Sequence, residues 1–485
     1  MLTLYDPGES SSHAITISIL PDDTLLEIFD FYAKDYKYPA RPLSKWHLLA
    51  QICHRWRQVL YASPRRLNLQ IFCTFGSPVR KNLAIWPAFP IAVNYYKPGR
   101  IITPDHEDDV IAALEHPDRV CYVRLDVTGS HLGRIATVMQ EPFQVLTHLI
   151  IFVRHGNAPV LPAEFLRGSA PCLQEITFAG IPFPSLPTLL LSASDLVTLK
   201  LYRIQPTGYF PPEAMASCLA ALPRLEWFII EFQSATPRPN QVHLPPMTRT
   251  LLPALTSFEF KGTSEYLENL VTHIDSPQLD WISIRYLNQL IDFQVAQLSE
   301  FVDRSVGPKL TPFGHAQVIF RGDWVTFAVH PDPSESSYWY PARTIIPCEG
   351  IDWQVSHIAQ VLSHFSPTLS TVAHLKLEVQ LKRGRQLEGV DDVEWLHLLH
   401  QFSAVKTLYL CRKLAKYVAL ALDDITAEMV DQVLPSLDLI HLAGQPASSV
   451  KKFVTARLLS GRPVTVIRTK TEFDKRLETY VSLRP

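Results

Sequence analysis

The chain has 485 residues, of which 47% are hydrophobic and 19% are charged, so it can bury ample apolar surface and is not mainly disordered. Its formal net charge of -2 provides no broad basic field, so neither nucleic acid nor a membrane surface is expected as a partner. The 39 prolines outnumber the 18 glycines, which inverts the usual ratio of these residues.

The cysteines and the N-terminal segment indicate where the protein works. The seven cysteines are dispersed and form no C-x-x-C pair, which is typical of reduced thiols in an intracellular protein. Acidic residues precede the first apolar run, where a signal peptide has basic ones, and no apolar run is long enough to span a bilayer. We therefore expect a soluble protein of the cytoplasm, the nucleus or both.

Two amphipathic helices are predicted near the N-terminus. Pro21 and the acids after it suit a helix start, and Leu25, Ile28 and Phe29 then recur on one helical face. A second apolar pattern runs from residue 46 to residue 60 and predicts one continuous helix. These helices either cap the rest of the chain or present apolar side chains to a partner, because so short a unit buries many aromatic residues with difficulty.

The same residues resemble the F-box, whose pattern is L-P-x-x-x-L-L-x-I-F followed by an apolar-Cys-basic-basic-Trp run. Residues 20–29 match the first part and residues 52–57 the second. The resemblance implies an all-α domain that docks on the Skp-type adaptor of a cullin-RING ubiquitin ligase. The residues that it implies for adaptor binding are Leu20, Pro21, Leu25, Leu26, Ile28, Phe29 and Trp56.

From residue 120 one short pattern recurs: apolar, two residues, apolar, one residue, apolar. Within each of two blocks the copies begin 23 to 33 residues apart, near the period of about 20 to 29 residues of a leucine-rich repeat, which has one strand and one helical segment per unit. The middle residues of the ten copies are Val123, Leu149, Ile176, Leu199, Phe228, Phe258, Ile282, Leu375, Leu408 and Ile440. Helices are expected between the strands at residues 104–114, 212–222, 263–274, 351–365, 392–402, 425–434 and 448–459.

The expected fold class is an α/β solenoid: a small all-α F-box-like N-terminal unit followed by an irregular leucine-rich-repeat horseshoe. Its expected parts are the F-box-like domain (15–72), a connector with the first strand and helix of the array (73–119), repeats (120–310), a hairpin and loop insertion (311–350), and further repeats with a C-terminal cap (351–485). In the insertion, residues 316–320 and 325–330 are predicted to form the hairpin and residues 331–349 a loop. Residues 165–173, 181–187 and 232–234 are similar to segments of fungal (basidiomycete-type) F-box proteins with leucine-rich repeats.

Prolines recur at one position before the repeat strands. Five of them stand two residues before the first leucine of a repeat strand, where we expect each to end the outer helix and start the strand. They are Pro171, Pro223, Pro253, Pro277 and Pro435.

The predicted binding surface is the concave face of the array. Side chains alternate along a strand, so the two residues that flank the middle apolar position point away from the core and form two rows across roughly 45 Å of stacked strands. Trp227 and Trp281 are the most informative members, since aromatic residues dominate binding hot spots; the alternative is that a loop or the curvature of the array buries their rings. Substrate contact is expected from Tyr122, Arg124, His148, Lys200, Trp227, Glu259, Trp281, Lys376 and Tyr409.

No catalytic, cofactor or metal site is expected. The chain has no G-x-S-x-G elbow, phosphate loop, dinucleotide fingerprint or H-E-x-x-H helix. His397 and His400 share a helical spacing but lack a third ligand nearby, and the acids after His106 suit the first turn of a helix. A site within residues 287–350 would be needed for the chain to be an enzyme.

Two functions are therefore weighed beside a third, an enzyme with an unrecognised site within residues 287–350, which only a deep pocket lined with perturbed titratable groups would support. The first is a non-catalytic substrate receptor of an SCF-type (Skp-cullin-F-box) ubiquitin ligase, which binds the adaptor through the F-box and an unknown protein substrate on the concave face. The alternative is a leucine-rich-repeat interaction scaffold unconnected with ubiquitin, whose N-terminal helices only cap the solenoid.

Overall fold

The computed structural model describes residues 19–34, 46–63, 69–86, 88–100, 102–154, 158–235, 249–287, 295–305, 314–330, 341–348, 350–365, 369–380, 390–425 and 429–469. The chain divides into two compact units, Met1–Leu125 and Asp126–Pro485, which are described one at a time. No described helix is long and apolar enough to cross a membrane.

The first unit begins with three helices, α1 (Asp22–Lys34), α2 (Trp46–Ile52) and α3 (His54–Ala62). Their core contains Leu25, Phe29 and Leu60, and the rings of Phe29 and Trp56 meet edge to face with centroids 4.8 Å apart. Arg55 joins α3 to the start of α1, because its guanidinium donates to the Leu20 carbonyl at 2.6 Å and pairs with the Asp22 carboxylate at 2.6 Å.

The prediction of one helix over residues 46–60 is wrong, because the chain breaks at Cys53. Its backbone is extended, with φ of -157° and ψ of 170°, and its Sγ accepts the Trp56 N–H at 3.5 Å as the N-cap of α3. The Arg57 side chain donates from Nε to the Ala50 carbonyl at 2.9 Å and so binds the end of α2. The apolar period continues across the break, which is why the sequence pattern does not reveal it.

The rest of the first unit alternates strands and helices: β1 (Ile71–Thr74), α4 (Val79–Ile85), β2 (Ile91–Tyr95), α5 (Pro104–Leu114) and β3 (Val120–Val127), whose last two residues belong to the second unit. β2 pairs in parallel with β1 and with β3. The segment between residues 73 and 119 therefore contains more regular structure than the single strand and helix that were expected there.

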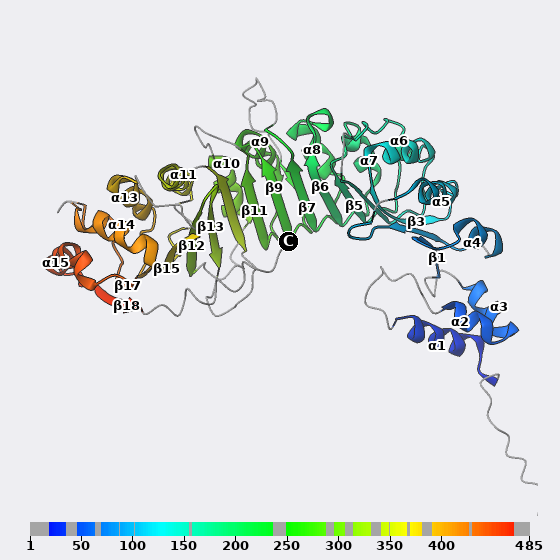
Figure 1. Ribbon diagram of the computed structural model, residues 1–485, viewed down its shortest axis with the longest axis horizontal. Helices are drawn as coiled ribbons and strands as arrows, with labels where there is room; N and C mark the ends of the chain where they lie inside the picture. The colour runs from blue at the N-terminus through cyan, green and yellow to red at the C-terminus, as the bar shows by residue number, and fades with distance from the viewer. Residues whose placement is uncertain are drawn as a thin grey trace, which may run out of the picture. The chain divides into compact units, whose positions relative to one another are not determined.

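The second unit is a large, mostly parallel sheet with helices on one face, as in an α/β solenoid (Figure 1). The sheet order from β4 onward is β4-β5-β6-β7-β9-β11-β14-β13-β12-β15-β16-β17-β18. These strands are β4 (His148–Val153), β5 (Glu175–Ala179), β6 (Thr198–Ile204), β7 (Trp227–Phe232), β9 (Ser257–Gly262), β11 (Trp281–Tyr286), β12 (His315–Arg321), β13 (Trp324–His330), β14 (Ala342–Pro347), β15 (His374–Gln380), β16 (Thr407–Leu410), β17 (Leu439–Ala443) and β18 (Thr465–Thr469). Each of the ten predicted repeat motifs contains a strand, counting β3 of the first unit.

Helices connect the strands and cover one face of the sheet, and the described residues place no helix on the opposite face, which is called the helix-free face (Figure 1). A separate pair of short strands, β8 (Thr250–Leu251) and β10 (Ile274–Asp275), lies outside the main sheet. The helices are α6 (Gly129–Val138), α7 (Leu186–Ser192), α8 (Pro212–Leu219), α9 (Ser264–Thr272), α10 (Ala296–Ser305), α11 (Ile351–Ser363), α13 (Asp392–His400), α14 (Arg412–Asp423) and α15 (Lys451–Leu459), with short 3-10 turns at Phe165–Gly168, Pro206–Gly208 and Ala447–Val450.

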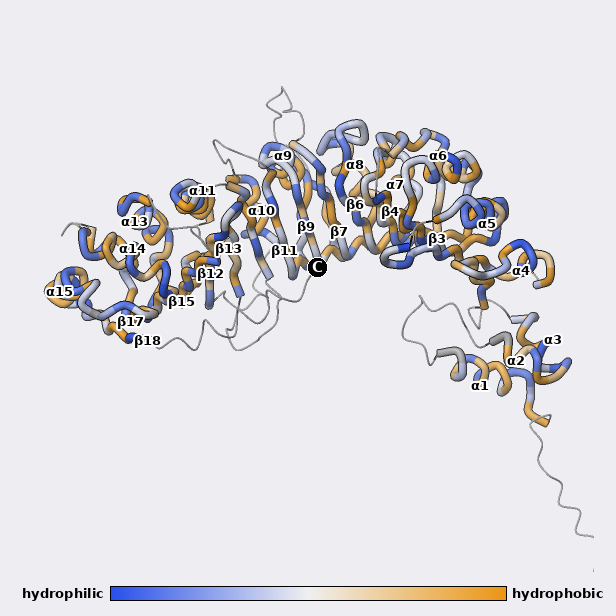
Figure 2. The backbone as a smooth tube through the Cα atoms, viewed as in Figure 1, coloured by the Kyte–Doolittle hydropathy of each residue, from blue (hydrophilic) through white to orange (hydrophobic). Residues whose placement is uncertain are grey.

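The core lies between the sheet and its helices. The middle residue of each repeat motif in this unit is buried, and Figure 2 shows hydrophobic residues recurring in strand after strand and in the covering helices. Phe228 and Phe258 stack on neighbouring strands with centroids 5.4 Å apart, and Phe301 of α10 meets Phe258 edge-on. Burial of this inward-facing row, at roughly 25 cal/mol per Å² of apolar surface, is the main term that holds the layers together.

The five prolines that precede repeat strands each occupy the second position of a tight turn. In every case the N–H of the leucine two residues after the proline bonds to the carbonyl of the residue before it, as in Leu225 to Leu222 at 3.2 Å and Leu279 to Ser276 at 3.3 Å. Proline suits this position because its fixed φ matches the turn and its missing N–H is not needed there. The prolines were expected to end the outer helices; they lie instead in the turns that follow the helices and precede the strands.

The predicted insertion contains the expected hairpin, since β12 and β13 pair antiparallel. It lies within the sheet, because β12 also pairs in parallel with β15, and β13 pairs antiparallel with β14. β14 pairs in turn with β11 in parallel. The prediction of a loop over residues 331–349 is wrong for 342–347, which form β14; residues 331–340 and 349 lie outside the described residues.

The helix predicted at residues 425–434 is also wrong: residues 429–436 form turns and Leu434 has a positive φ of 50°. On α15, the buried Arg457 guanidinium donates to the carbonyl of Val430 inside this segment at 3.5 Å, and to the carbonyls of Pro435 at 3.1 Å and Leu437 at 3.2 Å just after it. Carbonyls held by a side chain are not available to a helical ladder. Residues 426–428 lie outside the described residues.

Candidate protein-binding surface

The helix-free face of the second unit carries the two predicted rows in register. From β4 to β11 the pairing connects the first row, His148-Glu175-Thr198-Trp227-Ser257-Trp281, and the second row, Ile150-Thr177-Lys200-Ile229-Glu259-Ser283. The residues between them in each strand face the core and are buried. The alternation of strand side chains therefore places both rows on one surface.

The nine predicted substrate residues are distributed over the two units and over both sides of the insertion. Tyr122 and Arg124 lie on β3 of the first unit, where the Arg124 guanidinium lies 4.1 Å from the centre of the Tyr96 ring. Lys376 and Tyr409 lie on β15 and β16, which β14, β13 and β12 separate from β11. The members brought together on β4 to β11 are His148, Lys200, Trp227, Glu259 and Trp281.

Trp227 is the most exposed large aromatic residue of these rows, with 47% of its surface accessible. The Lys200 ammonium lies 5.9 Å from the centre of its ring and also 3.9 Å from a Glu175 carboxylate oxygen. Thr177 donates its hydroxyl to the same carboxylate at 3.1 Å. The surface on β5 to β7 is thus a mixture of aromatic, cationic and anionic groups, which suits a protein partner better than a nucleic acid.

A second group of outward side chains, two of them stacked rings, lies on β15 to β17, beyond the insertion. The rings of Tyr409 and His441 stack at 4.5 Å with planes 5° apart, and Lys376 stands beside Tyr409 in the pairing of β15 and β16. The Lys376 ammonium pairs with Glu378, whose carboxylate also accepts the Gln317 amide at 2.9 Å. These contacts fix the orientation of the side chains before any partner is present.

Histidines line the first row across the insertion. The His315 ring stacks between His330 and His374, with centroids 5.3 Å and 4.3 Å apart. Burial, and then the nearby charge of Lys406, lower the pKa of His374. Burial also lowers the pKa of His148, against the opposing effect of Glu175.

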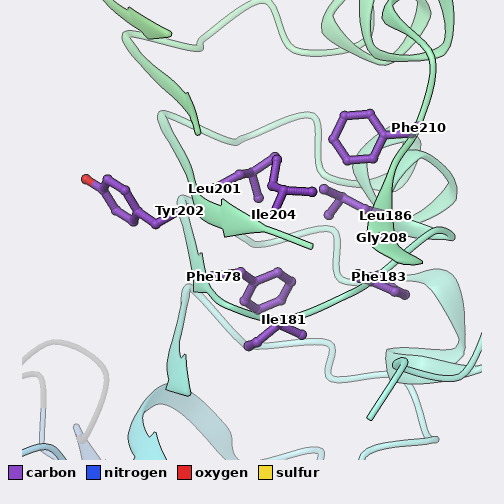
Figure 3. Close-up of a pocket in the computed structure, with 9 residues that line it drawn as sticks. All are labelled: Phe178, Ile181, Phe183, Leu186, Leu201, Tyr202, Ile204, Gly208 and Phe210. Atoms are coloured by element: carbon purple, nitrogen blue, oxygen red, sulfur yellow. The ribbon is translucent and has the colours of Figure 1, made fainter. Parts of the chain in front are cut away.

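A third row was missed by the sequence analysis. The strands continue two residues beyond the repeat motif and bring Tyr202, Glu231, Lys261 and Arg285 onto the same face. Figure 3 shows Tyr202 projecting from β6 on the side opposite to Leu201 and Phe210. Burial, followed by Glu259, Glu231 and Glu175, raises the pKa of Tyr202 to about 12. Strand alternation continued for one more step would have predicted these residues.

The cavities described are too small for a substrate of ordinary metabolic size. One lies between β5, β6 and the segment after them, with a volume of about 10 Å³ among apolar side chains such as Phe178, Leu186 and Phe210 (Figure 3). Another, of about 40 Å³, lies under β11 and β14 against α10 and α11. Ligand pockets usually measure about 300–1,000 Å³.

No group of three or more His, Cys, Asp or Glu residues in the described part of the chain could hold a metal ion. His397 and His400 lie exposed on α13. His106 completes a capping box at the start of α5, where its Nδ1 lies 2.7 Å from the Thr103 hydroxyl.

The three-helix segment of the first unit divides the predicted adaptor residues in two. Leu25, Leu26, Phe29 and Trp56 are buried in its own core, so their side chains hold the helices together. Leu20 is half-buried, whereas Pro21 and Ile28 are exposed. Further exposed apolar side chains on α1 and α2, which the resemblance did not single out, are Phe31 with 82% and Ile52 with 62% of their surface accessible, together with Tyr32 and Leu48.

No family model matches the sequence, and no curated protein matches it. Solved structures similar to this chain include the leucine-rich repeat-containing protein LegL7 from Legionella pneumophila, with 12% sequence identity and a TM-score of 0.28 over 71% of this chain and 99% of that one. A likeness of this degree carries no argument about family or partners. The repeat architecture therefore rests on the strand register and on the alternation of strands and helices.

Proposed function

We propose that the chain is a non-catalytic substrate receptor of a Skp-cullin-F-box ubiquitin ligase. Helices α1 to α3 bind the Skp-type adaptor, and the helix-free sheet face of the second unit binds the protein substrate. The observation that carries the adaptor half is the set of exposed apolar side chains on α1 and α2, where Ile28 and Phe31 are one helical turn apart. Exposed apolar groups of this size favour burial against a partner.

The free energy of burying this patch can be compared with the cost of association. Burial of Ile28, Phe31 and Ile52 gives roughly 5 to 9 kcal/mol at about 1.5 to 3 kcal/mol for each side chain. The loss of translational and rotational freedom consumes much of this gain, so the remaining affinity depends on how well the adaptor surface fits the helices.

Proximity is the mechanism on the substrate side. The face from β4 to β11 offers Trp227 as an exposed aromatic anchor among mixed charges, which is the composition of protein interfaces. A protein held there stands at a high effective concentration near the transferring enzyme of the ligase, and the chain itself needs no catalytic group.

The test is co-expression of the full chain with a Skp-type adaptor, followed by quantitative capture. The variant is Ile28→Asp/Phe31→Asp, which changes exposed side chains and leaves the core residues Leu25 and Phe29 in place. The matched control is Ile85→Asp, an equally drastic change at an exposed residue of α4 in the same unit. We expect the double variant to lose adaptor by more than about tenfold, as the loss of about 1.4 kcal/mol or more dictates, and the control to retain it.

Equal recovery of adaptor with the double variant would contradict the proposal. The alternative of an interaction scaffold unconnected with ubiquitin uses the same sheet face and predicts that the wild-type chain captures no adaptor at all. The two functions therefore differ in whether the wild-type chain captures the adaptor.

A further inference from the structure

Trp227, Ser257 and Trp281 stand side by side on β7, β9 and β11, and we call the site between the two outward tryptophans the slot. Ser257 pairs with Trp227 on one side and with Trp281 on the other. The Cα atoms of the two tryptophans are therefore two strand spacings, or about 10 Å, apart. The residues after them, including Phe228 and Phe258, face the core, so both indoles and the serine between them face outward.

The floor of this slot is an unsatisfied hydroxyl. Ser257 is only 3% exposed, and its Oγ has no hydrogen-bond partner. A buried hydroxyl left without a partner costs about 1 to 3 kcal/mol. A buried hydroxyl without a partner, on the strand between two outward aromatic residues, indicates a polar group that binds there.

Two carboxylates lie near the end of the slot, and Lys261 stands opposite one of them, Glu231, in the pairing of β7 and β9. Glu259 follows two residues after Ser257 on the same side of β9, and Glu231 lies on the adjacent strand, β7. Among the described residues, no ion pair within 4.0 Å joins either carboxylate to a cation. Arg343, the near cation on β14, instead donates to the Ser283 hydroxyl at 3.2 and 3.0 Å.

The charge of this site is costly without a ligand. Burial, and then the neighbouring Glu231, raise the pKa of Glu259, against the opposing effects of Arg343 and Arg285. A bound cation would lower this cost, because its positive charge stabilises a carboxylate that burial has removed from water.

We propose that the slot binds an arginine side chain of a protein partner. The guanidinium and its stem lie between the indoles of Trp227 and Trp281, one N–H donates to the Ser257 hydroxyl, and the charged head pairs with Glu259. This inference rests on the proposed role of the sheet face as the substrate-binding surface, and it names the chemistry of the substrate.

Each part of the slot matches that occupant. Indole faces attract cations, and the planar guanidinium stacks on them while it donates to a carboxylate. The chain already contains a cation on this aromatic surface, since Lys200 lies over the Trp227 ring. An acidic side chain would be repelled by Glu259 and Glu231, and an apolar one would leave the Ser257 hydroxyl unpaired.

The test is ligand-observed saturation-transfer NMR on the full chain, with N-acetyl-arginine methylamide as the probe. The matched probe is the citrulline analogue, which has the same shape and no charge. We expect the arginine probe to bind at least about tenfold more tightly than the citrulline probe, the difference that a charge-assisted hydrogen bond makes. Equal dissociation constants for the two probes would overturn the proposal.

Variants locate the site. Glu259→Gln and Trp281→Leu should each weaken binding of the arginine probe by about tenfold or more. Trp353→Leu is the matched control, because this tryptophan is exposed on α11, in the layer of helices. Glu259→Gln preserves side-chain shape and keeps the test decisive if the tryptophan variant unfolds. Unchanged binding by Glu259→Gln would place the probe elsewhere and refute the assignment.

The two proposals fail separately. Glu259→Gln leaves the adaptor patch on α1 and α2 intact and should capture a Skp-type adaptor as the wild type does. Adaptor capture without selective binding of the arginine probe refutes the slot alone. Selective binding of the probe without adaptor capture refutes the ligase role and leaves the slot as part of a scaffold.

Discussion

Arg457 shows how one charged side chain decides the path of a segment in the second unit. It is 1% exposed, and its guanidinium donates to the carbonyls of Pro435 and Leu437 from the last turn of α15. The turns at residues 429–436 replace the helix that the apolar pattern predicted. Local periodicity contains no information about a hydrogen-bond donor, such as Arg457, that lies 20 residues further along the chain than its acceptor.

Replacement of Arg457 by methionine should destabilise the C-terminal repeats by about 3 to 5 kcal/mol, because the Leu437 and Pro435 carbonyls would lose a buried charged donor. Chemical denaturation followed by circular dichroism measures the change. Arg462→Met is the control, since this exposed arginine also donates to the Pro435 carbonyl, at 3.5 Å. A loss no larger than that of the control would show that Arg457 does not hold the segment.

Glu268 gives the second unit a dependence on pH. It lies on α9 and accepts the backbone N–H groups of Gln297 and Leu298 at 2.8 and 2.9 Å, at the start of α10. Burial nevertheless raises the pKa of Glu268 from 4.5 to about 7, against the lowering effect of these two bonds. A pKa that is higher in the folded than in the unfolded chain means that folding favours the protonated carboxyl.

The stability that Glu268 contributes is therefore fully present below about pH 4.5 and is lost as the pH rises through about 7. The upper limit of this change is about 3 kcal/mol for a shift of this size. Thermal denaturation between pH 5 and 8 should show a smaller loss with rising pH for Glu268→Gln than for the wild type. Glu164→Gln, at an exposed position, should keep the wild-type slope; identical slopes for all three proteins would contradict the assignment.

Among the elements, the insertion differs most from its prediction. The alternation in residues 316–330 predicts the hairpin, and β12 and β13 confirm it. β14 was missed because Pro341 and Pro347 border a short run that begins with Ala342 and Arg343, which reads as a loop. Its strand conformation comes from tertiary pairing with β11 on one side and β13 on the other.

Phe327 tests whether the insertion is part of the core. It is 9% exposed on β13, lines the cavity under β11 and β14, and lies near Phe402 with ring centroids 6.5 Å apart. Phe327→Ala should cost about 3 to 5 kcal/mol in the free energy of unfolding, as the truncation of a core phenylalanine does. The control is Trp324→Ala at the exposed end of the same strand, expected to cost about 1 kcal/mol or less. Equal costs would mean that the hairpin is peripheral.

Over the whole chain, the sequence predicts well where side-chain period decides the structure and poorly where distant contacts do. The ten strands and their two outward rows follow from alternation, and the structure confirms the register from β4 to β11 and from β15 to β17. The break at Cys53, the turns under Arg457 and the third row around Tyr202 required three-dimensional contacts or strand ends that no local pattern contains. The binding roles of both surfaces remain predictions.

The burial of Ser257 illustrates the same limit at the candidate site. Trp227 and Trp281 are visible in the sequence as outward aromatic residues, but their placement on either side of one serine depends on the register of three strands. That register is set by the turn before each strand, including the proline turns at Pro253 and Pro277. The slot is thus a product of backbone geometry that sequence analysis specifies only in part.

The direction of the inserted strands has a consequence for how the array can change. β14 runs parallel to β11, and β12 runs parallel to β15, so β13 is the one reversed strand and both borders of the insertion keep the polarity of the repeats. Removal of all three strands leaves two borders that run the same way and can pair as ordinary repeats do. The borders of the insertion are therefore compatible with each other, and its gain or loss would change the width of the sheet while the repeats on either side keep their orientation.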